Sequence, residues 1–223
     1  GMHVHVSETS EEVDACRRRH GGKSPVTYLC DLGIFDIPTI AAHCVHVDEG
    51  DMETLASHNV TVAHCPASNM KLSSGAALVA EMQERGVKVA IGTDGPASNN
   101  TLDMFREMRL AALLSSLSTK NPASLSAADA ITMATVVGAQ GAGFSDVGIL
   151  RAGYTADLII INGEAPFMAT ERDVVEDIVY VAAGGGVEMT MVGGANIFLN
   201  GEKKAIGKKG AKYQGGGGMI RLL

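Results

Sequence analysis

Residues 87–99 read VKVAIGTDGPASN, and this stretch decides the interpretation of the fold. Branched residues alternate with smaller or polar ones as far as Ile91, which is the period-two pattern of a β-strand. Asp94 follows the strand, directly before a Gly-Pro turn signal. A carboxylate at the end of a buried strand is costly unless it binds something. Asp94 is therefore either a ligand-binding group or the cap of the helix that follows.

The same strand-and-helix unit is repeated upstream of residue 87. Strands are predicted at residues 2–8, 39–47 and 60–64, each followed by a helical pattern. This alternation is typical of a parallel sheet, in which the carboxyl ends of the strands meet at one edge. Active sites of α/β folds lie at that edge. The reactive residues placed there are His5, Glu8, His43, His64 and Asp94.

The sequence changes character after residue 147. Segments 157–161, 174–181 and 187–199 are predicted as short strands separated by glycine-rich turns. We therefore predict an α/β domain at residues 2–147 and a separate all-β unit at residues 148–202. Residues 203–223 are basic and rich in glycine, and we expect this tail to be disordered.

Composition excludes several classes of protein. The chain of 223 residues has 25 acidic and 18 basic side chains, so its net charge of −7 argues against a nucleic-acid or membrane-surface partner. No apolar run is long enough to span a bilayer. The four cysteines form no CxxC pair and nothing resembles a secretory signal, so we expect a cytoplasmic protein.

Histidines and a carboxylate at neighbouring strand ends point to a divalent metal. Imidazole and carboxylate are suitable ligands for zinc and similar ions. Cys44 and Cys65 each follow a strand-end histidine directly, and adjacent strand residues point to opposite faces. We therefore interpret both cysteines as core residues rather than as ligands.

Four segments carry a resemblance to a known family: HVHVSET, IAAHCVHV, HCPASNMKLSSG and IGTDGPASNN. They resemble successive strand ends of the amidohydrolase superfamily, in the aminohydrolase branch that includes methylthioadenosine/S-adenosylhomocysteine deaminases, guanine deaminases and chlorohydrolase-like enzymes. The resemblance covers residues 2–202 and aligns with the C-terminal half of such enzymes. It implies an α/β fold with a partial TIM-type (β/α) barrel, strands five to eight, followed by C-terminal β-sandwich strands.

The resemblance also implies roles for individual residues. His5 and Asp94 would bind the metal, zinc or another divalent ion such as iron. Glu8 would protonate a ring nitrogen, His43 would lie beside the metal-bound water, and Asp94 would also act as base. The implied substrate is a small purine-like nitrogen heterocycle, contacted by Glu8, His43, His64 and Asn69. The implied reaction is a metal-dependent deamination by activated water.

One departure from the family pattern bears on activity. The family's first strand supplies a His-x-His pair, and no matching strand is present. His3 and His5 share a strand face and are an alternative pair, but HVSET with Glu8 three residues after His5 matches strand five better, so we interpret His3 as a buried layer residue. We therefore expect a truncated chain with low metal occupancy that is inactive alone.

Two other functions stay open. The chain could be a non-catalytic half-barrel that acts through association with itself or a partner. It could also be a hydrolytic dechlorinase or cyclic amide hydrolase of the same superfamily.

We predict that the chain forms a homo-oligomer. Half a barrel has two open sheet edges and an uncovered face, and unpaired edges recruit further strands. Light scattering at micromolar concentration should give a mass of at least two chains. A compact monomer would contradict this prediction.

Overall fold

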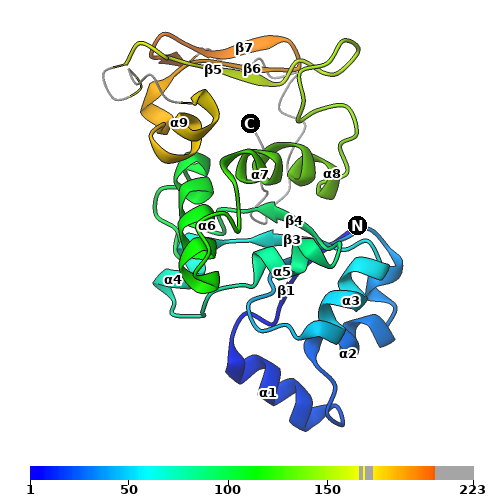
Figure 1. The fold of residues 1–223 in the computed structure, drawn as a ribbon. Coiled ribbons are helices and arrows are strands. Elements are labelled where there is room, and N and C mark those ends of the chain that lie inside the picture. The colour runs from blue at the N-terminus through cyan, green and yellow to red at the C-terminus, as the bar shows by residue number, and fades with distance from the viewer. Residues whose placement is uncertain (166–167, 169–172, 204–223) are drawn as a thin grey trace.

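The computed structural model describes residues 1–165, 168 and 173–203. It contains one parallel and one antiparallel sheet within these ranges (Figure 1). The helices of the described part include none that is long and apolar enough to cross a membrane. The predicted disorder of residues 204–223 concerns positions outside the described ranges.

The parallel sheet confirms the four predicted strand-and-helix units. Its strands pair side by side in the order of the sequence, all in parallel. They are β1 (Met2–Val6), β2 (Thr39–His43), β3 (Thr61–His64) and β4 (Lys88–Ile91). The described sheet is open, so closure into a barrel stays a prediction.

Helices follow each strand of the parallel sheet, and side-chain caps fix where most of them begin. Thr9, Ser24, Asp48, Asp103 and Ser126 each accept a hydrogen bond from a first-turn N–H group, which a helix cannot satisfy internally. The helices are α1 (Ser10–Arg19), α2 (Pro25–Asp31), the 3₁₀ turn η1 (Ile34–Asp36), α3 (Glu49–Ser57), α4 (Pro66–Lys71), α5 (Val79–Glu84), α6 (Met104–Thr119), α7 (Ala127–Thr132), the π-helical η2 (Met133–Val137) and α8 (Gly138–Gly141).

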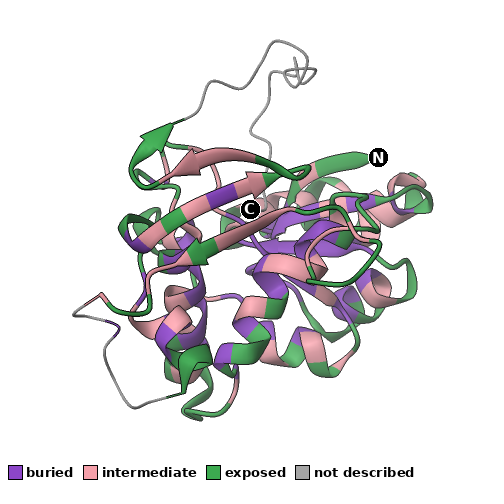
Figure 2. Cartoon of the chain, turned by 90° about the horizontal axis from the view of Figure 1, so that it is seen from above, coloured by how far each residue is buried: buried purple, intermediate pink, exposed green. Residues whose placement is uncertain are grey.

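The hydrophobic core lies at the two inner strands and the helices packed on them. All four residues of β3 are buried, as are four of the five in β2. Cys44 and Cys65 are 0% and 3% exposed, which confirms them as core residues. Figure 2 shows buried segments concentrated in this region, whereas the antiparallel strands are mostly intermediate or exposed.

The first strand is different from the inner ones. Met2, His3 and His5 are exposed, and only Val6 is buried. The interpretation of His3 as a buried layer residue is therefore wrong, because β1 is an edge strand of the described sheet.

The C-terminal part has a four-stranded antiparallel sheet beyond α7 and α9 (Figure 1). Its strands are β5 (Leu158–Ile161), β6 (Val187–Val192), β7 (Ala195–Leu199) and β8 (Glu202–Lys203), with the 3₁₀ turn η3 (Gly184–Gly186) before β6. These strands confirm the change of structure predicted after residue 147. The described residues form one sheet here, so a two-sheet sandwich and the domain boundaries stay predictions.

The predicted strand at residues 174–181 is wrong. This segment is the helix α9 (Val174–Tyr180). Its branched residues favour a strand, but Asp173 caps the first turn by accepting from the Val175 N–H at 2.9 Å. The helix also packs on α6 and α7, with Val179 fully buried. Tertiary packing and the cap therefore outweigh the local strand preference.

Gly141 of α8 allows this helix to pack against β3, and we predict that Gly141→Ala destabilises the fold. A Cβ at Gly141 would lie 2.6 Å from Cγ2 of Thr61, whose branched side chain has little freedom to move. Such overpacking costs about 1–3 kcal/mol. Urea unfolding should show this loss.

Gly50 of α3 provides the control. A Cβ there would lie 3.5 Å from Asp48 Oδ1, which is an ordinary contact. Gly50→Ala should therefore be neutral or stabilising by up to about 1 kcal/mol. Equal stabilities of the two variants would contradict the packing argument.

Candidate active site

The carboxyl ends of the parallel strands bring three predicted residues together. His5 lies on β1, His43 ends β2, and Asp94 follows β4. One ligand atom from each of the three lies within 4.8 Å of the others. The rings of His5 and His43 stack with centroids 5.3 Å apart. The edge predicted from the strand pattern is therefore the place where these groups converge.

Left-handed backbone conformations at the strand ends produce this convergence. The φ angles of Ser7, His43 and Asp94 are 51°, 75° and 57°. In the parallel register His43 is the partner of Val6, so regular alternation would place its side chain on the face opposite to His5. The left-handed conformation of His43 interrupts that alternation. Such conformations cost about 1–3 kcal/mol each and are concentrated at functional sites.

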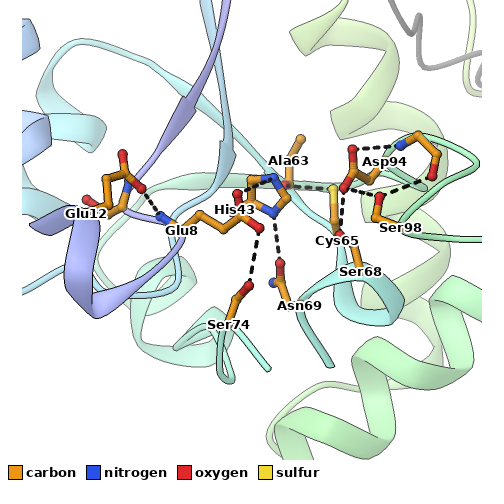
Figure 3. A network of polar contacts seen from close by, with 12 residues as sticks. Glu8, Glu12, His43, Ala63, Cys65, Ser68, Asn69, Ser74, Asp94 and Ser98 are labelled. Carbon is orange, nitrogen blue, oxygen red and sulfur yellow. Dashed lines mark hydrogen bonds and ion pairs between the residues drawn. The ribbon is translucent and has the colours of Figure 1, made fainter. Parts of the chain in front are cut away.

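Asp94 is held by three hydrogen bonds (Figure 3). The hydroxyls of Ser68 and Ser98 both donate to its Oδ2 at 2.6 Å, and the Gly95 N–H donates to Oδ1 at 2.7 Å. Burial by itself raises the pKa of Asp94, but these three bonds outweigh burial and hold the pKa below its usual value. Asp103 caps the following helix α6, so the alternative of a helix cap at Asp94 is wrong.

His43 lies between Asn69 and Glu8 (Figure 3). Its Nδ1 is 2.8 Å from Asn69 Oδ1, and because an amide oxygen only accepts, Nδ1 carries the proton. The other ring nitrogen, Nε2, lies 3.7 Å from Glu8 Oε2. Asn69, predicted to contact substrate, is fully buried and in the structure it contacts His43.

Hydrogen bonds fix both the backbone and the side chain of Glu8. Its backbone N–H donates to Glu12 Oε2 at 2.8 Å, and the neighbouring Ser7 N–H donates to Glu12 Oε1 at 3.3 Å. Ser74 Oγ donates to Glu8 Oε1 at 3.2 Å. The Glu8 side chain is 23% exposed, so its carboxylate is positioned but accessible.

His64, also predicted to contact substrate, ends β3 and is 1% exposed. Its Nδ1 is buried and has no hydrogen-bond partner among the described residues. Burial, and then the nearby His43, lowers the pKa of His64 to about 4, so the ring is neutral at pH 7. The substrate roles of His64 and Asn69 stay predictions.

The donor set fits a divalent metal. Two imidazoles and an ionised carboxylate are ligand types that zinc accepts, and three protein ligands with an open position are typical of catalytic zinc. His5 and Asp94 are the predicted ligands, and His43, the third member of the cluster, lies beside them with its Nδ1 bound to Asn69.

The family is decided by comparison with known proteins. A family model described as the amidohydrolase family matches residues 1–197. The chain belongs to the amidohydrolase family.

Three relatives illustrate where in this family the chain lies. It is 46% identical over 198 residues to a 5-methylthioadenosine/S-adenosylhomocysteine deaminase of Pelotomaculum thermopropionicum, covering 89% of this chain and 46% of that protein. It is 48% identical over 194 residues to a 5'-deoxyadenosine deaminase of Methanosarcina mazei, covering 87% and 44%. Among solved structures, an adenosine deaminase from Xanthomonas campestris with bound zinc matches with a TM-score of 0.88 and 33% identity, covering 93% and 47%. This amidohydrolase chain therefore spans about half the length of the curated relatives it matches.

Several site residues of this amidohydrolase chain were not predicted. Glu12 could have been found from the sequence, because Thr9 and Glu12 have the spacing of a capping box. Ser68 and Ser74 could not, since the carboxylates that they bind lie 26 and 66 residues away in the sequence.

We predict that Ser68→Ala raises the pKa of Asp94, because one of the donors that favour its ionised form is lost. A carboxyl whose pKa is depressed by folding stabilises the protein above its unfolded pKa, and this stability is lost as pH falls through the folded pKa. The variant should lose about 1 kcal/mol at neutral pH, and its further loss of stability in acid should be smaller and should end at a higher pH. Urea unfolding across acidic pH values measures both.

Ser57→Ala is the control, since the described contacts of the exposed Ser57 hydroxyl, with the Thr54 carbonyl and His58 Nδ1, include no carboxylate. Its pH profile should match that of the wild type. An unchanged Ser68→Ala profile would show that Ser68 does not stabilise ionised Asp94.

Proposed function

We propose that this chain carries the proton-transfer groups and part of the metal site of an aminohydrolase that deaminates 6-aminopurine nucleosides. The observation that carries the proposal is the convergence of His5, His43 and Asp94, with Glu8 beside His43. A metal held in part by His5 and Asp94 would lower the pKa of water from its bulk value to roughly 7.

Asp94 is suited to accept the proton of the attacking water. Its pKa lies below the usual value, so the group is ionised at neutral pH. Its Oδ2 already accepts two hydrogen bonds and Oδ1 accepts one. Oδ1 is therefore the oxygen with spare capacity for a ligand or a proton.

His43 is suited to orient the water. Asn69 fixes its proton on Nδ1, so Nε2 can accept a hydrogen bond from the nucleophile. Burial of both residues prevents the ring from turning away, because rotation would leave a buried polar atom without a partner.

Glu8 is suited to protonate the ring nitrogen next to the attacked carbon. Its carboxylate is accessible, and Ser74 and Glu12 fix its position. Water adds across the carbon–nitrogen double bond, with its oxygen on the carbon and a proton on the ring nitrogen. The proton taken by Asp94 then moves to the amino group, the carbon–nitrogen bond breaks with loss of ammonia, and the hydroxyl proton of the adduct returns to Glu8 as the carbonyl forms.

The substrate class rests on the named relatives. The proteins from P. thermopropionicum, M. mazei and X. campestris are named for nucleosides or thioethers that share adenosine and differ at the 5′ position. We infer the same adenine ring for this chain, with the 5′ substituent open. Dechlorination, cyclic amide hydrolysis and a non-catalytic role in association remain the alternatives.

The test is a chimera in which the matched residues of this chain replace the corresponding segment of the P. thermopropionicum relative. We expect ammonia release from 5-methylthioadenosine or adenosine. Glu8→Gln should lower kcat by at least about a hundredfold, because general acid–base groups contribute 10²–10⁴-fold. Zinc content should be unchanged, since Glu8 is assigned to proton transfer and not to metal binding.

Glu11→Gln is the matched control, because Glu11 is an exposed glutamate three residues after Glu8, in the first turn of α1. It should leave kcat unchanged. Full activity in the Glu8→Gln chimera would refute the role of Glu8. Chloride release from a chlorotriazine without ammonia release from adenosine would favour the dechlorinase alternative.

A further inference from the structure

Glu107 is a fully buried carboxylate that the proposed mechanism does not use. It lies in the first turn of α6 and is 0% exposed. Glutamate is almost never fully buried unless it is paired. The described ion pairs do not include Glu107, and its described hydrogen bonds come from neutral groups, the Ala67 N–H and the Asn99 amide.

The first bond of Glu107 fixes the loop after β3. The Ala67 N–H donates to Glu107 Oε2 at 3.1 Å, at the start of α4. This helix has no side-chain cap from Cys65. The two residues after Ala67 are Ser68 and Asn69, which bind Asp94 and His43.

The second bond fixes the loop after β4. Asn99 Nδ2 donates to Glu107 Oε1 and to the Thr93 carbonyl, both at 2.8 Å. Thr93 directly precedes Asp94, which has the left-handed backbone. One carboxylate therefore contacts both loops that place the groups of the site.

We propose that Glu107 is a positioning residue that sets the placement of Asp94 relative to His43. This inference rests on the proposed function, because it assigns Glu107 a role in the site described above. A purely structural role predicts that loss of Glu107 affects stability alone. A positioning role predicts that metal affinity also falls.

Glu107→Gln affects the bond to the loop after β4 and spares the bond to the loop after β3. The glutamine oxygen can still accept from the Ala67 N–H, but the Nε2 group then faces the amide donor of Asn99. Asn99 can relieve this conflict by turning its amide group away from Glu107. The same Nδ2 then no longer holds the Thr93 carbonyl, so the peptide before Asp94 is released. Asn99→Ala releases the same peptide directly.

Asp51→Asn is the matched control. Asp51 is 2% exposed, and its carboxylate accepts from a side-chain hydroxyl, Ser24, and from a backbone N–H, Asp48. An asparagine there replaces one acceptor oxygen of a buried carboxylate by an amide donor, as Glu107→Gln does. Ser24 and Asp48 cap α2 and α3, and their described contacts do not include His5, His43 or Asp94.

The experiment titrates Co²⁺ into the full chain and follows the visible absorption of the bound metal, with circular dichroism confirming that each variant is folded. We expect the Kd for Co²⁺ to rise about tenfold in Glu107→Gln and in Asn99→Ala, the lower end of the effect of outer-shell changes. Adding Glu107→Gln to Asn99→Ala should change Kd little further, because both act through the same peptide. Asp51→Asn should lower stability and leave Kd unchanged.

The outcomes distinguish the two proposals. Wild-type affinity in folded Glu107→Gln and Asn99→Ala would overturn the positioning role and leave the proposed function standing. Equal weakening of Co²⁺ binding in Asp51→Asn would show that the effect comes from lower stability alone. That result would also overturn the positioning role. A wild-type chain that binds no Co²⁺ at millimolar concentration would overturn the metal site and, with it, the positioning role.

Discussion

The parallel pairing of β1 to β4 is the constraint on which the rest of the structure depends. Parallel strands must be joined by crossover segments, so all four carboxyl ends lie at one edge of the sheet. His5, His43 and Asp94 are separated by tens of residues in sequence and still lie within 4.8 Å of one another. An antiparallel arrangement would have placed alternate strand ends at opposite edges.

Convergence at this edge is unfavourable without compensating contacts. Left-handed backbone at Ser7, His43 and Asp94 and partial burial of a carboxylate both raise the free energy of the folded state. Hydrogen bonds from nearby loops offset part of this cost, with Ser68 and Ser98 bound to Asp94 and Asn69 bound to His43. The loops are thus part of the site, because they keep the strained strand ends in one arrangement.

Helix α6 connects this site with the C-terminal part of the chain. On one side Glu107 accepts hydrogen bonds from the two strand-end loops. On another side Arg109 donates to the carbonyls of Val179 and Ala182 at the end of α9. Helix α9 is therefore packed against the same helix that supports the site.

The sequence by itself determined the strand-and-helix units, the edge at which reactive groups gather, and the residues His5, Glu8, His43 and Asp94. Those features depend on local periodicity and on the order of elements, and both can be read from neighbouring residues. The helix at Val174–Tyr180 was not predictable, because packing on α6 and α7 and the Asp173 cap overcame a strand-like composition. The bonds from Ser68 to Asp94, from Ser74 to Glu8 and from Ala67 to Glu107 were decided only by the tertiary structure. Their partners are brought together by folding over 26 to 66 residues of sequence, and local patterns contain no record of such contacts.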